Sequence, residues 1–255
     1  MKALRFLLII VCTLSLTGCA STKQADSDSS LGKAQQTLDS LYQHYSAKDS
    51  YLLRESYPFD EQHKVTYLAS EDQANMPNQF SYLWPYSGTF SAVNALLEAT
   101  HDKKYQQLLD KRVLPGLEEY FDIQRTPNAY SSYIQTAPTS DRFYDDNVWL
   151  GIDFTDIYQI TQEKRYLDKA QLIWKFIESG TDSLLGGGIY WCEQKKESKN
   201  TCSNAPGSVL ALKLFKATND SIYFRQGKEL YEWTQKNLQD STDYLYFDNI
   251  GLDRK

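Results

Sequence analysis

The chain has 255 residues, a formal net charge of −6 at pH 7, and an aromatic content of 14%. The acidic balance argues against a nucleic-acid partner, because phosphate backbones are bound by clustered basic side chains. Only three histidines occur, and the absence of HExxH, P-loop and G-x-S-x-G motifs leaves zinc, nucleotide and esterase-type serine chemistry without support.

The N-terminus, residues 1–18, has the pattern of an export signal. Two basic residues precede an apolar stretch, 6–16, that is too short to span a membrane. It ends in Leu-Thr-Gly-Cys at 16–19, which resembles the lipobox of bacterial lipoproteins; an ordinary secretory signal is the alternative. Cleavage before Cys19 would leave a lipidated cysteine. We therefore expect a lipid anchor in the bacterial outer membrane, on the cell surface or facing the periplasm.

The stretch after the signal is rich in Ser, Asp, Lys and Gln and holds no aromatic residue. This composition predicts a flexible tether over 19–30. The remainder, 31–255, is expected to form one domain.

Helical periodicity predicts seven helices joined mostly by short turns. Three turns, at 99–105, 160–166 and 217–223, share the pattern apolar-Thr-x-acid-x-x-Tyr. Helical hairpins repeated at this spacing cannot bury both faces alone and must stack on each other, which predicts an all-α toroid. Longer connections, such as 123–143 and 180–203, would line one end. The expected helices are 31–47, 81–100, 103–122, 146–161, 164–179, 204–218 and 221–239.

Two adjacent carboxylates, Asp145 and Asp146, stand at the start of one predicted helix, among Phe143, Tyr144 and Trp149. Paired carboxylates with aromatic walls are what a glycosidase needs. Like charges raise the pKa of one acid, and the helix N-terminus favours the other as an anion. One would then donate a proton while the other acts as nucleophile. The alternative is ordinary capping of the helix.

A run of three glycines, 186–188, interrupts the helical pattern and allows close backbone approach to a ligand or to another loop. Tyr190 and Trp191 follow it and would suit either a sugar platform or core packing. Trp84, before Pro85 at a helix entrance, is expected to keep an accessible face and to bind sugar.

Two cysteines, Cys192 and Cys202, remain after the signal and the lipidation site are set aside. In an oxidising compartment they are candidates for a disulfide. Two reduced thiols are the alternative.

Several segments, taken in order from about residue 31 to the end, together resemble glycoside hydrolase family 76, the bacterial α-1,6-mannanases. The matching segments are Tyr144-Asp145-Asp146-Asn147 with Trp149, Thr161 with Tyr166-Leu167-Asp168-Lys169-Ala170, Gly186-Gly187-Gly188-Ile189-Tyr190-Trp191, Lys199-Asn200 with Ser203-Asn204, and Thr218-Asn219-Asp220.

The resemblance implies an (α/α)6 barrel and a retaining mechanism, with Asp145 as nucleophile and Asp146 as general acid/base. Retention requires carboxyl groups roughly 5–5.5 Å apart, which neighbouring residues at a helix start can meet. From the motifs and the aromatic clusters, the residues expected to bind substrate are Trp84, Tyr144, Asn147, Trp149, Tyr190, Trp191, Lys199 and Asn200.

The expected activity is therefore cleavage of α-1,6-mannosidic linkages in α-mannan or mannooligosaccharides. A non-catalytic glycan-binding lipoprotein on the same scaffold is the alternative, and a helical-repeat interaction protein is a third reading. No cofactor is expected, although carboxylates in the loops do not exclude a bound calcium ion.

A closed toroid of this kind has twelve helices, whereas about seven are predicted here. The chain is therefore expected to be truncated at its C-terminus and inactive by itself. In that case Leu230, Trp233 and Leu238 on the last helix would expose apolar surface to water.

Overall fold

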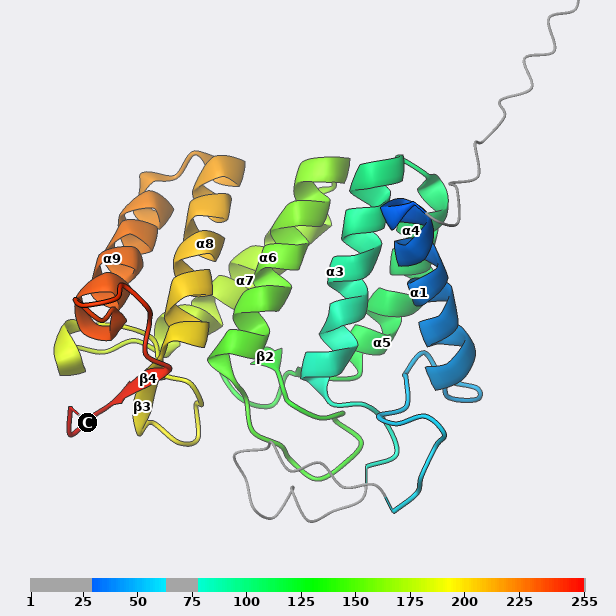
Figure 1. Cartoon of the computed structure of the whole chain (residues 1–255), viewed down its shortest axis with the longest axis horizontal. Helices are drawn as coiled ribbons and strands as arrows, with labels where there is room; N and C mark the ends of the chain where they lie inside the picture. Colours follow the sequence, from blue (N-terminus) through cyan, green and yellow to red (C-terminus); the bar gives the residue numbers. More distant parts are fainter. Residues whose placement is uncertain (1–28, 63–77, 255) are drawn as a thin grey trace, which may run out of the picture.

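The structure is a computed structural model that describes residues 29–62 and 78–254 (Figure 1). The predicted signal, the lipidation site Cys19 and most of the tether lie outside the described residues. Within the described ranges, no helix is both long and apolar enough to cross a membrane.

Helices dominate the fold, and their bounds agree closely with the predicted ones. They are α1 (Ser30–Tyr45), α3 (Leu83–Thr100), α4 (Lys103–Leu108), α5 (Leu114–Glu118), α6 (Tyr144–Thr161), α7 (Lys164–Ser179), α8 (Thr201–Thr218) and α9 (Ser221–Leu238). A short 3-10 turn, η2, covers Leu184–Gly186. Two small antiparallel pairs join β1 (Phe121–Asp122) to β2 (Ala129–Tyr130) and β3 (Ser198–Asn200) to β4 (Asn249–Gly251).

The helix expected over 103–122 departs from regular geometry. A π-helical segment, Leu109–Val113, joins α4 to α5. Pro115 follows it and has no N–H to donate to the carbonyl of Lys111, so the regular ladder cannot continue there. Residues 121–122 pair as β1 instead of extending the helix.

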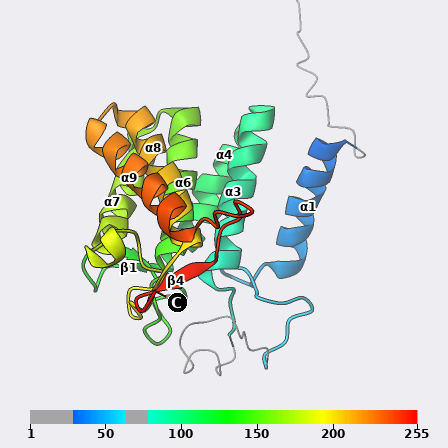
Figure 2. The same ribbon diagram turned by 60° about the vertical axis from the view of Figure 1, so that its left-hand side comes forward.

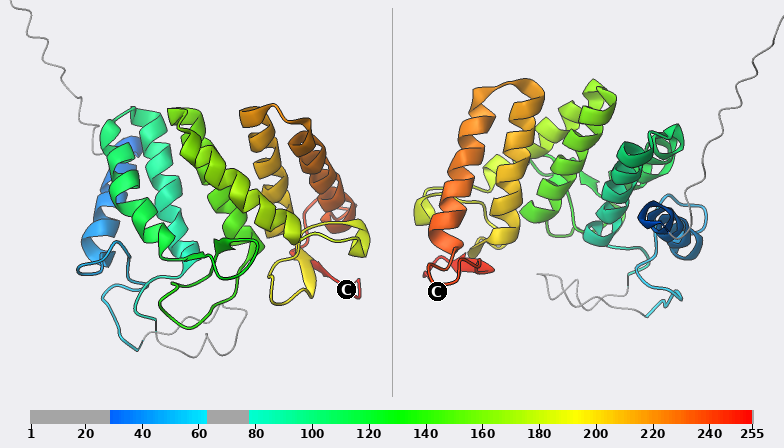
Figure 3. Two further views of the ribbon diagram at one scale, coloured as in Figure 1. Left: turned by 180° about the vertical axis from the view of Figure 1, so that it is seen from behind. Right: turned by 45° about the horizontal axis from the view of Figure 1, so that its top comes forward.

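The helices α3, α6 and α8 lie side by side and run in the same direction, and each is followed by a returning helix (Figures 1 and 2). Their N-terminal ends meet the loops and small strands at one end of the molecule, while short turns close the other end. Figure 3 shows the same row of hairpins from behind and from above. The predicted all-α toroid of helical hairpins is confirmed over the part that this chain spans.

The three turns with similar sequences also have the same conformation. The residue after each threonine is left-handed, with φ of 54° at His101, 60° at Gln162 and 58° at Asn219. In the first turn, the Thr100 hydroxyl donates to a carbonyl of the preceding helix and accepts the N–H of Asp102 at 3.1 Å. The other two turns repeat both bonds. The sequence repeat is therefore a structural repeat.

Capping by the acid of this motif holds in two of the three turns. Asp102 and Asp220 each accept the backbone N–H two residues further on, at 2.9 Å. Glu163, with one more methylene, binds the side chains of Gln106 and Arg165 instead.

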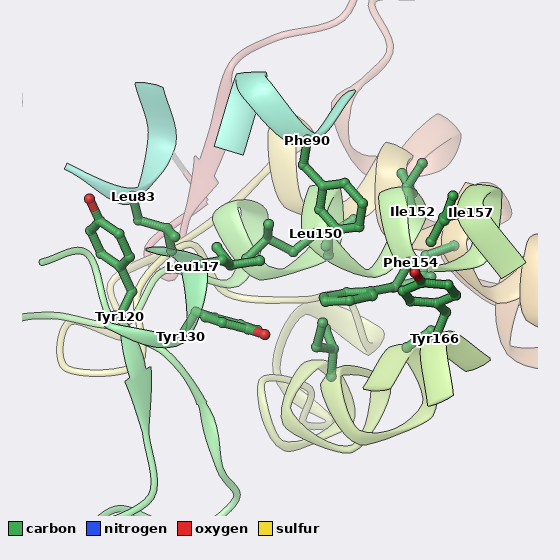
Figure 4. Close-up of a cluster of buried hydrophobic side chains, with 14 of the residues drawn as sticks. Leu83, Phe90, Leu117, Tyr120, Tyr130, Leu150, Ile152, Phe154, Ile157 and Tyr166 are labelled. Carbon is green, nitrogen blue, oxygen red and sulfur yellow. The ribbon is translucent and has the colours of Figure 1, made fainter. Parts of the chain in front are cut away.

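The core is centred on α6, which packs against α3, α7 and α8 (Figure 4). Phe90 meets Phe154 edge-on at 4.9 Å, and Tyr166 lies beside the same ring. A Cβ at Gly151 would lie 2.5 Å from Leu210, so the missing side chain lets α8 approach closely. Because α6 is enclosed by three neighbours, the position of its N-terminal end is fixed.

The prediction that three apolar side chains of the last helix are exposed to water is wrong. Leu230, Trp233 and Leu238 are buried, because this side of α9 packs on α8 and on the glycine-rich loop. The exposed large apolar side chains of this hairpin are Val209, Leu212, Ile222, Phe224 and Tyr231.

Candidate active site

The two adjacent aspartates lie in the first turn of α6, at the end of the molecule where the loops gather. The N-cap residue is Phe143, in an extended conformation, and its side chain makes no cap hydrogen bond. Neither aspartate therefore occupies the N-cap position.

Asp145 is partly buried, and its carboxylate lies beside Trp191 and beside Cys202 in the first turn of α8. Its Oδ2 accepts a 3.2 Å hydrogen bond from the indole Nε1 of Trp191. Burial raises the pKa of Asp145, and hydrogen bonds from the thiol of Cys202, the backbone amide of Asp146 and the Trp191 indole oppose the rise. The other oxygen, Oδ1, is buried and has no hydrogen-bond partner among the described residues.

Asp146 is the more deeply buried acid, with 7% of its surface exposed. Burial raises the pKa of Asp146 well above its ordinary value, and the negative charge of Asp145 raises it further. The donors around Asp145 favour its anion, whereas Asp146 is favoured in its protonated form. This asymmetry is what divides two carboxyl groups into a base or nucleophile and an acid.

The loops around the pair are held together as short extended segments. The N–H of Tyr144 donates to the carbonyl of Trp191 at 2.9 Å, so the start of α6 is bonded to the segment that carries the indole. The Phe143 and Trp191 rings also touch, with centroids 4.9 Å apart. On its other side, the N–H of Trp191 donates to Ser198 at 3.3 Å.

Three tryptophans with accessible surface lie at the same end of the helix row. Trp149 is 40% exposed and follows Asp145 by four residues, so both lie on one face of α6. Trp84 is 51% exposed in the first turn of the neighbouring helix α3. Trp191 is half-buried beside Asp145. These three keep the aromatic surface that a sugar ring requires.

Two residues expected to bind substrate on α6 belong to the framework instead. Tyr144 is fully buried, with its ring stacked on Phe176 at 4.6 Å. Asn147 is also fully buried; its amide donates to the carbonyls of Tyr130 and Phe143 and accepts the N–H of Tyr130. The nitrogen and the oxygen of the Asn147 side-chain amide are thus both used to hold the preceding loop.

The same correction applies to three residues beyond the glycine-rich loop. Tyr190 is 2% exposed and donates its hydroxyl hydrogen to Asp182. Lys199 is fully buried, and its ammonium group binds Asp182 and the carbonyls of Leu184 and Gly187. Asn200 is buried and accepts a hydrogen bond from Ser198. The Tyr190 hydroxyl and the Lys199 ammonium group are thus satisfied inside the protein and are not presented to a ligand.

Asn204 lies in one of the segments that resemble the family, but its role in the framework was not predicted from the sequence. It repeats the role of Asn147 on the next hairpin, bonding the carbonyls of Ile189 and Asn200 and the N–H of Ile189. The two asparagines are 57 residues apart, the same spacing as the repeated tyrosines Tyr166 and Tyr223. The internal repeat was the signal that could have identified this pair.

The group that closely approaches the glycine run is a side chain of the protein itself, the ring of Trp233. Gly188 has φ of +83°, and a Cβ there would lie 2.6 Å from the ring of Trp233. A cavity of about 310 Å³ beside this loop is lined by Trp174, Trp233 and residues 186–188, and neither Asp145 nor Asp146 lines it. Gly188 therefore serves the packing of α9.

The candidate disulfide is not formed. Cys192 and Cys202 are both free thiols in the described chain. Cys192 is buried beside Gln194, and burial raises its pKa to about 11. Cys202 lies in the first turn of α8 and interacts with Asp145. The loop between them is held by backbone hydrogen bonds, from Glu193 to the carbonyl of Arg142 and from Leu252 to the carbonyl of Glu197. Nothing in the sequence indicated that Cys202 would reach the acid pair.

Comparison with known proteins gives a consistent picture. Residues 56–255 match the sequence model of glycosyl hydrolase family 76. The chain is similar to the solved mannosidase Bt3792 of this family from Bacteroides thetaiotaomicron VPI-5482, with 31% identity and a TM-score of 0.73 over 86% of this chain and 57% of that one. It is also similar to a family 76 glycoside hydrolase from a bovine Bacteroides thetaiotaomicron strain, with 30% identity and a TM-score of 0.72 over 88% and 46% of the two chains.

A more distant likeness, which shows the fold, is to the α-1,6-mannanase GH76A from Salegentibacter sp. HEL1_6. It has 24% identity and a TM-score of 0.65, covering 87% of this chain and 56% of that one. An inactive variant of that enzyme has been solved with α-1,6-mannotriose. The chain thus spans about half the length of these solved relatives. No curated protein matches it.

Proposed function

Because the chain belongs to glycosyl hydrolase family 76, we propose that Asp145 and Asp146 are the catalytic pair of a retaining hydrolase that cleaves α-1,6-mannosidic linkages in α-mannan. The observation that carries the proposal is the asymmetry of the pair. Asp145 is surrounded by hydrogen-bond donors, whereas Asp146 is buried next to a negative charge. Two carboxyl groups in such unequal environments suit the two roles that glycoside hydrolysis needs.

In the first step, the protonated Asp146 transfers its proton to the glycosidic oxygen as the bond from that oxygen to the anomeric carbon breaks. The carboxylate of Asp145 attacks the anomeric carbon and forms a glycosyl ester. The proton leaves with the released sugar hydroxyl.

In the second step, Asp146 is ionised and takes a proton from a water molecule. The hydroxide attacks the same anomeric carbon, and the ester bond to Asp145 breaks. Two inversions give net retention of configuration, and both carboxyl groups return to their starting protonation states.

The substrate is an uncharged polysaccharide in this proposal. Trp84, Trp149 and Trp191 provide the aromatic surfaces on which sugar rings pack. The chain carries a formal charge of −6, so electrostatic attraction to a polyanion has no support. The assignment of the cleaved bond as a 1,6-linkage comes from membership of the family alone.

Because the chain spans about half the length of its solved relatives, the test uses a form extended to their length. The assay with α-1,6-mannan follows the released sugars and their first-formed anomer by proton NMR. Binding of α-1,6-mannotriose is measured on the same samples. We expect product of retained configuration, and loss of it in Asp145→Asn and Asp146→Asn, whereas Asp168→Asn on the surface of α7 is the matched control. Near wild-type rates in both site variants would overturn the assignment. Binding of the trisaccharide without any product would instead favour the glycan-binding alternative.

We also propose that the protein is lipid-anchored in the outer membrane through Cys19. The support is the Leu-Thr-Gly-Cys sequence after a short apolar stretch. Mass spectrometry of the membrane fraction should find a lipidated peptide beginning at Cys19, and Cys19→Ser should release the protein from that fraction. An unmodified cysteine in mature protein would contradict the anchor.

A further inference from the structure

One fully buried arginine, Arg142, stands three residues before Asp145. Its guanidinium group forms a forked ion pair with Glu193, through Nε at 2.7 Å and Nη2 at 2.5 Å. Nη1 donates to the carbonyl of Pro127 at 2.9 Å and lies 3.6 Å from Asp122. The side chain of Arg142 therefore joins the loop after β1 to the loop that follows Trp191.

The backbone of the same residue makes the same connection. The N–H of Arg142 donates to the Gln194 side chain at 2.8 Å, and its carbonyl accepts the N–H of Glu193 at 3.0 Å. Two residues further on, the N–H of Tyr144 bonds to the carbonyl of Trp191. Segments 142–144 and 191–194 are thus paired in one register, with Arg142 at one end and the Trp191–Asp145 hydrogen bond at the other.

We infer that Arg142 is a positioning residue that sets the register of these two segments and so holds the Trp191 indole on Asp145. The inference rests on the proposed function of the acid pair. Arg142 makes no described contact with either aspartate; it acts through Glu193 and Trp191. If the segments shift, the indole no longer meets Oδ2, and the orientation of the carboxylate is no longer fixed.

The chemistry of the guanidinium group suits this role. A planar fork donates two parallel hydrogen bonds to a carboxylate and so defines an orientation as well as a distance. A lysine in the same place would keep the charge but not the fork. A buried ion pair adds little net stability, because the cost of desolvation offsets the attraction, so its main contribution here is geometric.

The test follows the indole N–H groups, since the protein has only 5 tryptophans. Their hydrogen exchange with solvent is measured by nitrogen-15 NMR on the ligand-free full chain, with the Trp191 signal identified by its loss in Trp191→Phe. Trp174 and Trp233 are internal references, because their indoles bond to Gln226 and to the Leu185 carbonyl. Arg142→Lys and Arg142→Gln should each accelerate exchange at Trp191 by about tenfold, the change expected for one ordinary hydrogen bond. The two reference indoles should keep their rates.

A matched control removes a different ion pair of α6. Lys213→Gln breaks the pair with Asp156, three turns from the acids, and should leave Trp191 exchange unchanged. Unchanged Trp191 exchange in both Arg142 variants would overturn the inference. Equal acceleration at the indoles of Trp191, Trp174 and Trp233 would also overturn it, because it indicates a general loosening of the protein. If Arg142→Gln does not fold, Arg142→Lys and Glu193→Gln decide the question. Indole exchange does not depend on turnover. Failure of this inference can therefore be distinguished from failure of the proposed hydrolysis.

Discussion

The indole nitrogen of Trp191 lies 3.2 Å from Oδ2 of Asp145 and joins two residues that are 46 positions apart in the sequence. This bond couples the glycine-aromatic segment to the acid pair. It also gives Trp191 a chemical role beyond an aromatic surface, because a donor at Oδ2 stabilises the carboxylate.

Replacement of Trp191 by phenylalanine should raise the pKa of Asp145. The indole lowers that pKa by donating to the carboxylate, and phenylalanine keeps an aromatic ring without a donor. Titration of carboxyl carbon resonances in protein labelled with carbon-13 aspartate would measure the shift, with the Asp145 signal assigned by Asp145→Asn. An unchanged titration would mean that the hydrogen bond has no energetic weight.

Asp146→Asn should stabilise the fold at alkaline pH while abolishing turnover. The pKa of Asp146 is raised in the folded state, so its contribution to stability is full below the pKa of the unfolded chain and is lost as pH rises through the folded value. Asparagine removes that loss. Thermal melts at pH 5 and pH 8 should show a larger gain at pH 8 than at pH 5, because the loss begins near the pKa of the unfolded chain. A variant that melts below the wild type at pH 8 would contradict the burial of a charge at this position.

A second buried acid, Asp153, offers an independent pH test away from the site. Ser91 donates to it at 2.7 Å, and burial raises its pKa to about 7. The folded state therefore binds a proton that the unfolded chain releases near pH 4, and stability from this group falls as pH rises from about 4 through about 7. Asp153→Asn should remove this dependence, an effect on the order of a few kcal/mol. Urea unfolding at several pH values measures it, with the exposed Asp168→Asn as control.

Gly188→Ala should destabilise the protein by about 1–3 kcal/mol, because an alanine is strained at φ of +83° and its methyl group would collide with Trp233. Gly88 provides the contrast. It lies inside α3 with nothing within 4 Å of an added Cβ, so Gly88→Ala should stabilise the protein by about 0.5–1 kcal/mol. Both values come from urea unfolding followed by circular dichroism. A Gly188→Ala variant that is as stable as the wild type, or more stable, would disprove the packing assigned to the glycine loop.

The sequence by itself determined the helices, the repeated turns and the place of the acid pair, since these depend on interactions within a few residues. Thr100 and Asp102 form their turn with near neighbours, and the same local bonds recur at the other two turns. The first turn of α6 likewise places Asp145 and Trp149 on one face because they are four residues apart.

Which polar and aromatic residues face a ligand was decided only by the tertiary structure. Asn147, Tyr190 and Lys199 have the chemistry of sugar-binding side chains, yet each is buried by a partner from another segment. Cys202 gave no signal in the sequence and lies beside Asp145. Burial and hydrogen bonding between distant segments depend on how the hairpins stack and on the register of the loops at their ends, and no local pattern encodes either of them.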